Sequence, residues 1–429
     1  MWDRALGSIS QQCAQGHSCF TLSMRKPTYH RAALTFLFLC LLACLPSYTQ
    51  AVSSTSEDEQ ALSAATQGLC RTQVAMLGEN AAHGDGHTVA FKVALVERLV
   101  DQCGFNSVFF EASHDEFIHL NKRLRLGQAV TSEDLLSAVG GIWKFDREFL
   151  PLAPFLLARA QTGRVFLGGL DDQLGQLGQN YANDEMVAEL TNLLPEPKRH
   201  RCSTAALHKR IYYDYPESAP YSKLDQSQIS SCLSDIRTAS TVDKATGSVE
   251  KGERLEMISA AQRCVSRDFS SNAENMVNRD RSMFQTFEWL QSRLPKRQKV
   301  IVWAATVHIA KQGNPAWGDR TGTNLGSFIH REYGLDAYSL GFSALTGSYR
   351  QGKEKFPLLP PAPPDSVEVR ALQDTNASAS YVGPSHLAAM GTSPGAFFIH
   401  SYQTLPWSNF LDGAVVFRAE HQPGDTRDK

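Results

Sequence analysis

Short apolar runs recur along the chain and alternate with longer segments that have the periodicity of helices. A strand buried on both faces of a parallel sheet reads as a continuous apolar run, whereas a strand with one solvated face alternates. The first four runs are continuous, which predicts an α/β fold with a mostly parallel sheet flanked by helices. The predicted strands cover residues 73–77, 107–110, 164–167, 300–303, 337–340, 396–399 and 414–417.

The segment between the first two predicted strands has the pattern of a helix. Phe91, Leu95, Val96 and Leu99 fall on one side of it. Gly104 follows, and glycine commonly ends a helix because it adopts the left-handed conformation without strain. Strand, helix and strand together form a βαβ unit of the expected length, which favours parallel pairing of the two strands.

Residues 183–295 contain no convincing strand and are predicted to form a helical insertion. The apolar stripe near its end, with Met283 and Phe287, is typical of a helix packed on a core. Residues 357–364 hold a dense run of prolines, which block both helix and central strand and so predict a stiff surface loop. We expect one α/β domain over residues 52–429 that carries the insertion.

The first fifty residues follow a different pattern, in which three basic residues precede an apolar run over residues 32–45. This run is shorter than the about 20 apolar residues that span a bilayer, and it fits the h-region of a secretory signal. Residues 1–51 are therefore predicted to be a signal region, with Met24 as the true start, and the mature protein to be periplasmic or secreted. Cys44 ends a segment that loosely resembles a lipoprotein box, so a lipid anchor is the alternative. No other membrane contact is expected.

Composition excludes one class of partner. The chain has 429 residues, of which 42% are hydrophobic and 20% are charged, and its formal net charge is −2. These values are typical of a globular protein with a large core. No basic excess exists to neutralise phosphates, so nucleic-acid binding is not expected.

Removal of the signal region would leave five cysteines, Cys70, Cys103, Cys202, Cys232 and Cys264. An exported protein meets an oxidising compartment, where disulfides form. Five is an odd number, so at least one thiol is unpaired within the chain. The pair that we predict is Cys202 with Cys232, because they bracket a polar stretch. No C-x-x-C spacing occurs, so the cysteines do not indicate a zinc ribbon.

Acidic and histidine residues follow four of the predicted strands, at the point where each strand ends. In an open parallel sheet, ligands bind outside the carboxyl ends of the strands. These residues are therefore expected to converge on one edge of the sheet and to form an active site there. In chain order they are Glu79, His83, His87, Glu111, Asp171 and His308.

His83 is the candidate general base. A histidine with a pKa near neutral that is oriented by a carboxylate can deprotonate a water molecule. Glu79 lies four residues earlier, so a helical turn would bring the two side chains together, and Gly78 and Gly84 permit a tight turn. A second histidine or a buried acid could then stabilise the oxyanion or protonate the leaving group. This pattern predicts a hydrolase that activates water.

A serine mechanism is an alternative, because residues 391–395 match G-x-S-x-G around Ser393. A nucleophile elbow needs a strand before the serine and a helix after it. Here a predicted loop precedes the motif, a predicted strand follows it, and Pro394 is awkward in the elbow. The pattern therefore disfavours a serine nucleophile.

Several short motifs resemble the erythromycin esterase family in their order and spacing, over about residues 70–420. They are Gly78-Glu79, His83-Gly84, Gly104-Phe105, Glu111, Gly169-Leu170-Asp171, Arg279-Asp280-Arg281, Val302-Trp303-Ala304, His308 and Phe410-Leu411-Asp412-Gly413. The resemblance implies metal-independent hydrolysis of a macrolide lactone ester, with no cofactor. The expected partner is a small-molecule ester or lactone substrate.

The resemblance also implies roles for individual residues, because a histidine in the first family motif is the general base. The residues that we assign to catalysis are His83, Glu79, Glu111 and His308. Those that we assign to substrate binding are Lys92, Asp171 and His87.

Three departures from the family pattern keep other hypotheses open. Three residues, instead of the usual two, separate Glu79 from His83. Lys92 stands where the family usually has arginine, and lysine lacks the planar fork that grips a carboxylate twice. Ala305 occupies the place of a frequent second histidine. A non-catalytic ligand-binding protein of the same fold is thus one alternative. A metal-dependent hydrolase is another, since the four catalytic candidates could also form a metal site.

Overall fold

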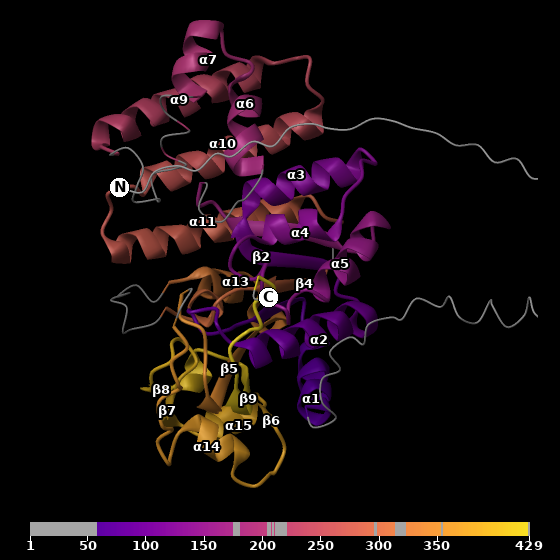
Figure 1. Cartoon of the computed structure of the whole chain (residues 1–429), viewed down its shortest axis with the longest axis vertical. Coiled ribbons are helices and arrows are strands. Elements are labelled where there is room, and N and C mark those ends of the chain that lie inside the picture. Colours follow the sequence, from indigo (N-terminus) through magenta and orange to yellow (C-terminus); the bar gives the residue numbers. More distant parts are fainter. Residues whose placement is uncertain are drawn as a thin grey trace, which may run out of the picture. The chain divides into compact units, whose positions relative to one another are not determined.

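A seven-stranded sheet runs through the part of the chain that the computed structural model describes (Figure 1). That part comprises residues 58–174, 181–203, 207, 210, 221–295, 298–313, 323–352 and 355–427, so the predicted signal region lies outside the described residues. The strand order is β3-β2-β4-β1-β5-β9-β6, and every neighbouring pair is parallel except β6 with β9. The prediction of a mostly parallel sheet is therefore confirmed. The strands of this sheet are β1 (Val74–Leu77), β2 (Ser107–Ser113), β3 (Phe166–Asp171), β4 (Val300–Trp303), β5 (Ala337–Gly347), β6 (Ala379–Val382) and β9 (Gly413–Glu420).

Helices flank the sheet, and the predicted helix after the first strand is confirmed as α2. The α-helices are α1 (Glu59–Leu69), α2 (Gly86–Cys103), α3 (His114–Arg125), α4 (Ser132–Val139), α5 (Leu152–Gln161), α6 (Met186–Thr191), α7 (Glu196–Cys202), α9 (Lys223–Val242), α10 (Ser248–Ser266), α11 (Asn272–Ser292), α12 (Thr306–Ile309), α13 (Leu325–Tyr333), α14 (Val367–Leu372) and α15 (Pro384–Ala389). A π-helical turn, η1, spans Tyr181–Glu185, and two 3₁₀ turns are η4 (Gly334–Asp336) and η5 (Trp407–Asn409). No helix in the described part of the chain is long and apolar enough to cross a membrane.

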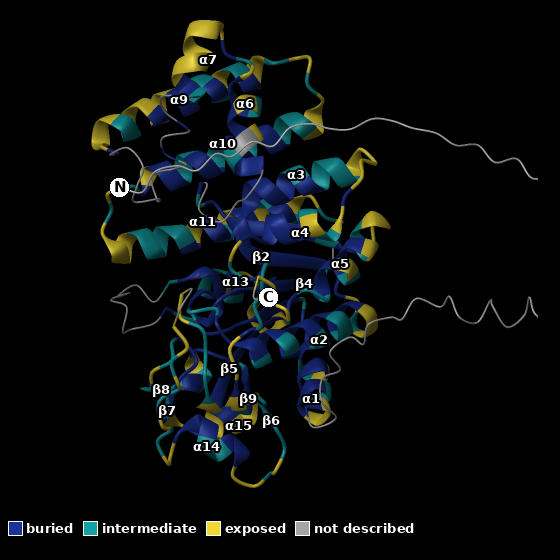
Figure 2. Cartoon of the chain, viewed as in Figure 1, coloured by how far each residue is buried: buried dark blue, intermediate teal, exposed yellow. Residues whose placement is uncertain are grey.

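Each central strand presents alternate residues to two separate cores. In β1, Ala75 and Leu77 join a core with helices α1, α2, α4 and α5, whereas Val74 and Met76 join a core with α11 and α13. All four residues are fully buried, and Figure 2 shows the same for the central strands as a group. Burial on both faces explains why these strands have no polar alternation in the sequence.

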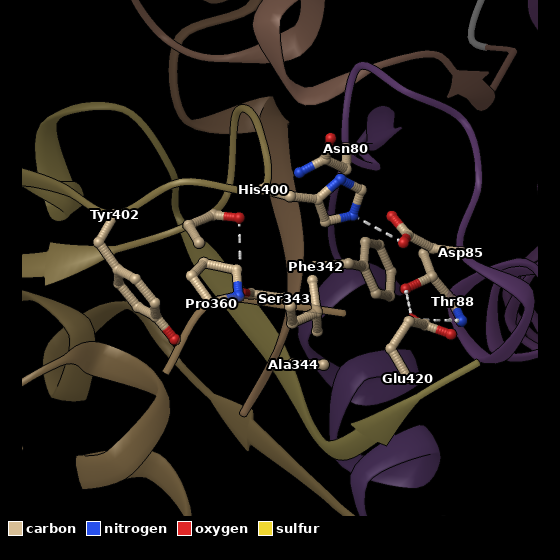
Figure 3. Close-up of a pocket in the computed structure, with 12 residues that line it drawn as sticks. Asn80, Asp85, Thr88, Phe342, Ser343, Ala344, Pro360, His400, Tyr402 and Glu420 are labelled. Carbon is tan, nitrogen blue, oxygen red and sulfur yellow. Dashed lines mark hydrogen bonds and ion pairs between the residues drawn. The ribbon is translucent and has the colours of Figure 1, made fainter. Parts of the chain in front are cut away.

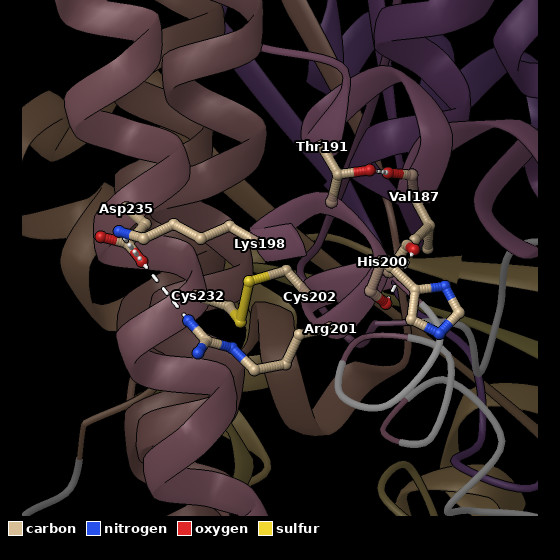
Figure 4. Close-up of a disulfide and its surroundings, with 9 residues drawn as sticks. Val187, Thr191, Lys198, His200, Arg201, Cys202, Cys232 and Asp235 are labelled. Atoms are coloured by element: carbon tan, nitrogen blue, oxygen red, sulfur yellow. Dashed lines mark hydrogen bonds and ion pairs between the residues drawn. A yellow bond between two sulfur atoms is a disulfide. The ribbon is translucent and has the colours of Figure 1, made fainter. Parts of the chain in front are cut away.

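The predicted helical insertion consists of helices joined by turns and contains no strand in its described residues. Helices α6, α7, α9 and α10 pack around a third core, and they lie together at the upper end of Figure 1. The predicted disulfide between Cys202 and Cys232 joins α7 to α9 (Figure 4). A second disulfide, Cys70–Cys103, links the ends of α1 and α2 and was not predicted. Cys264 is the buried free thiol that an odd count requires.

One predicted strand is wrong. Residues 396–399 form bends rather than a strand. Their apolar run is buried by ring packing instead of a sheet ladder, because Phe397 and Phe398 lie 5.0 and 5.3 Å from the Trp407 ring, between ring centres. The preceding residues form β7 (Thr392–Gly395), which pairs with β8 (Gln403–Pro406). Ser393 therefore lies inside an antiparallel strand and not on a strand-to-helix elbow.

The proline-rich segment 357–364 forms no helix or strand, as predicted, and makes a single isolated bridge from Leu358 to Ser348. The edge strand β6 was missed in the sequence. It has only four residues and its two middle positions are half-buried, so it lacks the continuous apolar signal of the central strands.

Candidate active site

A turn after β1 places His83 against Glu79. The His83 Nδ1 lies 2.8 Å from Glu79 Oε1, which confirms that the two side chains meet. A tight turn brings them together rather than a helix, since α2 begins only at Gly86. The His83 amide donates to the carbonyl of Asn80 at 2.9 Å, and His83 itself adopts a positive φ of 51°. The additional residue in this segment is therefore absorbed in the turn, and the pair of side chains is kept.

Glu79 is a buried carboxylate with three side-chain partners. Besides His83, it accepts hydrogen bonds from Trp143 Nε1 at 2.9 Å and from Lys92 Nζ at 3.1 Å. Burial alone would raise the pKa of Glu79, but Lys92 and His83 outweigh it, so the pKa is lowered and the group stays ionised. The Lys92 ammonium also lies 4.0 Å from the centre of the Trp303 ring.

The charge of Glu79 acts in turn on its two basic neighbours. Burial lowers the pKa of His83, but the carboxylates of Glu79 and Glu111 outweigh that effect and raise it overall. Burial also lowers the pKa of Lys92, here to about 8, although Glu79 opposes the shift. The net effect on His83 is a raised pKa, so its ring is a stronger base than an isolated imidazole.

Arg279, from helix α11, joins the ends of β2 and β3. Its guanidinium donates to Glu111 Oε1 from Nη2 at 2.8 Å and to Asp171 Oδ2 from Nε at 3.0 Å. The second Glu111 oxygen accepts from the backbone amide of Ala305 at 2.9 Å. Burial would raise the pKa of Glu111, but His308 and Arg279 hold it well below its ordinary value. The buried carboxylates are therefore paired, as buried charges must be.

His308 lies on the short helix α12 after β4, between two carboxylates. Its Nδ1 is 2.8 Å from Asp280 Oδ1 and its Nε2 is 3.1 Å from Glu111 Oε1. Burial lowers the pKa of His308, yet Asp280 and Glu111 outweigh it and raise the pKa to about 10. Arg279 Nη1 also lies 3.1 Å from His308 Nε2. When the His308 ring is protonated, both nitrogens are donors, and both side chains face the Glu111 carboxylate. His308 is therefore an imidazolium at neutral pH.

The four contributing strands are contiguous in the sheet, in the order β3-β2-β4-β1. Backbone hydrogen bonds tie the segments that follow β1 and β4, because the Thr306 amide donates to the Glu79 carbonyl at 2.7 Å. The structure thus brings Glu79, His83, Glu111 and His308 to one edge of the sheet.

A cavity of about 370 Å³ opens beside His83, whose side chain is 16% exposed. It is lined by Ala82, His83, Gly141, Ile142, Phe145, Asp146, Arg350, Gly352 and Arg427. This volume falls in the range of small-molecule sites. A neighbouring hollow behind the same turn holds only about 10 Å³, enough for about one water molecule. Figure 3 shows that His400, Asp85, Thr88 and Glu420 fill it with contacts to one another.

Sequence and structure comparisons place the chain among known proteins. A model of the erythromycin esterase family matches residues 100–404. The chain belongs to the erythromycin esterase family. The matched residues include Glu111 and His308, and they begin after Glu79 and His83.

Relatives of this family member share its fold at low identity. A Bacillus subtilis (strain 168) protein, YbfO, described as a hydrolase, is 20% identical over 384 residues, which are 81% of this chain and 82% of YbfO. A Bacillus cereus protein of known structure matches with a TM-score of 0.66 at 16% identity, over 86% of this chain and 93% of its own. An erythromycin esterase mutant in its open conformation matches with a TM-score of 0.62 at 14% identity, over 84% of this chain and 94% of the esterase chain. Family and relatives together indicate a hydrolase.

The residues that the sequence suggested for substrate binding in this erythromycin esterase family member do not line the cavity. Lys92 is fully buried beneath Glu79, and Asp171 is held by Arg279. His87 points the other way, with Nε2 2.7 Å from Asp58 Oδ2 and Nδ1 3.0 Å from the carbonyl of Ala419. Their burial and existing contacts favour structural roles, and direct substrate contact by these three stays a prediction.

Three residues of this family member that touch the catalytic candidates received no role from the sequence, namely Arg279, Asp280 and Trp143. Arg279 and Asp280 lie on helix α11, which packs Met283, Phe287 and Leu290 against the core. A charged residue on the side of a helix that packs on the core is costly unless it is paired. The position of these two charges next to apolar core residues was therefore the sequence feature that could have indicated buried ion pairs. Trp143 gave no such signal, because a buried tryptophan is ordinary core and only the fold places its indole at Glu79.

Proposed function

We propose that this chain hydrolyses a carboxylic ester or lactone, and that His83 is the general base that activates water. The contact that carries the proposal is His83 Nδ1 to Glu79 Oε1, beside a cavity of substrate size. A carboxylate at Nδ1 selects the tautomer that keeps a lone pair on Nε2. His83 makes no other side-chain hydrogen bond to a described residue, so Nε2 can take a proton from a water molecule in the cavity.

Lys92 and Trp143 support this role of Glu79. Lys92 neutralises the carboxylate and Trp143 fixes the orientation of the same oxygen that faces His83. The ring of Trp143 also meets the His83 ring edge-on, with ring centres 5.4 Å apart. A base that is held in this way loses little freedom when it reacts, which lowers the barrier to proton transfer.

His308 serves as a fixed positive charge rather than as a second base. Its pKa of about 10 keeps it protonated near neutral pH, and both ring nitrogens face carboxylates. Together with Arg279 it keeps Glu111 ionised near His83, and that charge raises the pKa of the base. Ala305 contributes its backbone amide to the same carboxylate.

The same contacts disfavour a metal-dependent hydrolase. A metal would have to displace Lys92 from Glu79 and Arg279 from Glu111. Among the described residues, no group of three or more histidine, cysteine or acidic side chains is arranged to hold a metal ion. We therefore expect a chelator to leave the hydrolysis rate unchanged.

The test is a screen of aryl esters, alkyl esters and lactones, including a macrolide lactone because one solved neighbour is an erythromycin esterase. We expect His83→Ala to lower kcat/KM by about 100-fold or more, the usual contribution of a general base. The matched control is His386→Ala, which removes an exposed histidine in α15. Full activity in His83→Ala contradicts the mechanism. Tight binding of a panel member without turnover by the wild type favours a ligand-binding protein instead.

A further inference from the structure

A second titratable side chain, that of Asp146, lines the cavity beside His83. Asp146 is 1% exposed, and its Oδ1 lies 2.7 Å from Arg350 Nη1. Its Oδ2 makes no hydrogen bond to any described residue. A buried carboxyl oxygen loses its hydration, so it normally has a partner. Asp146 also lines a cavity of substrate size, so a ligand in that cavity is the partner that we expect for this oxygen.

The backbone holds Asp146 close to the catalytic pair. Asp146 follows Trp143 by three residues, and its amide donates to the Trp143 carbonyl at 3.0 Å. Trp143 in turn donates its indole N–H to Glu79. One short turn therefore places one side chain on the Glu79 carboxylate and the other on the cavity wall, so the two are positioned together.

Ester cleavage needs a proton donor as well as a base, because an alkoxide is a poor leaving group. Among the described residues that line the cavity, His83 and Asp146 are the groups that can exchange a proton, since the arginines stay protonated. His83 can return the proton of the attacking water to the leaving group, as a single histidine does in serine hydrolases. A carboxyl group that already holds a proton can donate it without waiting for that transfer. His308 does not line the cavity, and both of its nitrogens are engaged.

We infer that Asp146 is the general acid that protonates the leaving alcohol, an inference that rests on the proposed hydrolysis. The oxygen of water bonds to the carbonyl carbon while its proton moves to His83 Nε2. The ester C–O bond then breaks, and the departing oxygen keeps the electron pair and takes the proton of the Asp146 carboxyl. The products are a carboxylic acid and an alcohol, and the proton on His83 returns to Asp146 through solvent.

The surroundings of Asp146 suit this role. Burial raises the pKa of Asp146 to about 7, Arg350 opposes the rise, and Glu79 and Glu148 add to it. His83 and Arg427 are the other charged or titratable groups at the same cavity. The carboxyl is thus protonated in a substantial part of the molecules at neutral pH. After the transfer, the Arg350 guanidinium stabilises the carboxylate that remains.

The inference also names a substrate class, esters or lactones whose leaving group is an unactivated alkyl alcohol. An activated phenol leaves without protonation and makes no use of the acid. The cavity, with apolar Ile142 and Phe145 beside the Asp146–Arg350 pair, can accommodate an apolar alkyl group next to a polar centre.

The experiment compares p-nitrophenyl, phenyl and ethyl butyrate as substrates of the wild type, Asp146→Asn, Asp146→Glu and the control Asp374→Asn. Asp374 is an exposed aspartate that does not line the cavity. We expect Asp146→Asn to lower kcat for ethyl butyrate by about 100-fold or more, the usual size of general acid catalysis, and to leave p-nitrophenyl butyrate within a few-fold of wild type. We expect Asp146→Glu to regain part of the ethyl ester activity.

The outcomes separate this inference from the proposed function. A loss in Asp146→Asn that grows from the nitrophenyl to the ethyl ester supports the acid. An equal loss on all three esters, or none, overturns it, and the proposed base is then judged by His83→Ala alone. His83→Ala should lower all three rates together, because the base is needed with every leaving group. Undiminished rates in His83→Ala overturn both the proposed base and the inferred acid.

Discussion

Arg279 Nη2 donates to Glu111 Oε1 over 2.8 Å, although 168 residues separate the two in the chain. The same guanidinium also binds Asp171, so one side chain of α11 pairs with carboxylates at the ends of two adjacent strands. Only arginine presents several N–H donors in a rigid planar fork. This contact links α11, the last helix of the insertion, to the edge of the sheet where the catalytic candidates lie.

Replacement of Arg279 should therefore cost both stability and activity. Arg279→Met leaves two buried carboxylates without their cation, and breaking a buried pair in this way costs about 3–5 kcal/mol. We expect a lower urea midpoint, read by circular dichroism, and a lower kcat. Arg281→Met, two residues further on and exposed, is the matched control and should unfold like the wild type. Equal midpoints for both variants would show that the Arg279 contacts carry no net stability.

The pH dependence of kcat/KM should report the protonation of His83. A general base works only when neutral, so the rate should rise as pH rises through the His83 pKa. Glu79 and Glu111 raise that pKa, which places the rise above the ordinary histidine value of about 6.5.

Glu79→Gln should shift this acid limb to lower pH, because the largest favourable partner of the imidazolium is lost. Lys92 would then be buried without its carboxylate, so Glu79→Gln with Lys92→Met is the better-folded comparison. An acid limb at the same pH in these variants would mean that another group titrates.

Gly84 lies very close to the loop after β5, and we expect this close contact to be essential for the position of His83. A Cβ on Gly84 would lie 1.9 Å from the carbonyl oxygen of Arg350, and the Arg350 amide donates to Gly84 at 2.9 Å. Gly84→Ala must push this loop and the adjacent turn apart. We expect a lower melting temperature and a drop in kcat, measured by calorimetry and initial rates.

Gly252→Ala is the matched control, since nothing lies within 4 Å of an added Cβ in helix α10. There the change should raise stability slightly, by about 0.5–1 kcal/mol, because glycine is unfavourable inside a helix. Unchanged activity in Gly84→Ala would contradict a rigid coupling between this loop and His83.

Much of the framework could be predicted from the chain alone. Continuous apolar runs such as residues 300–303 identify strands buried on both faces, and the residues after them identify the catalytic edge. The Cys202–Cys232 pair could also be inferred. These features depend on local patterns, because burial of a strand and the end of a helix leave their marks within a few residues.

Other features were decided by tertiary structure. The run 396–399 has the composition of a strand, but it is buried against Trp407 in a bend. The contacts of Trp143 with Glu79 and of Arg279 with Glu111 join positions that are far apart in the chain. The sequence by itself determined the sheet and the candidates at its edge. Whether a histidine there can serve as the proposed base, like His83, or is a buried imidazolium, like His308, was decided by the charges that folding places around it, because a pKa depends on neighbours in space.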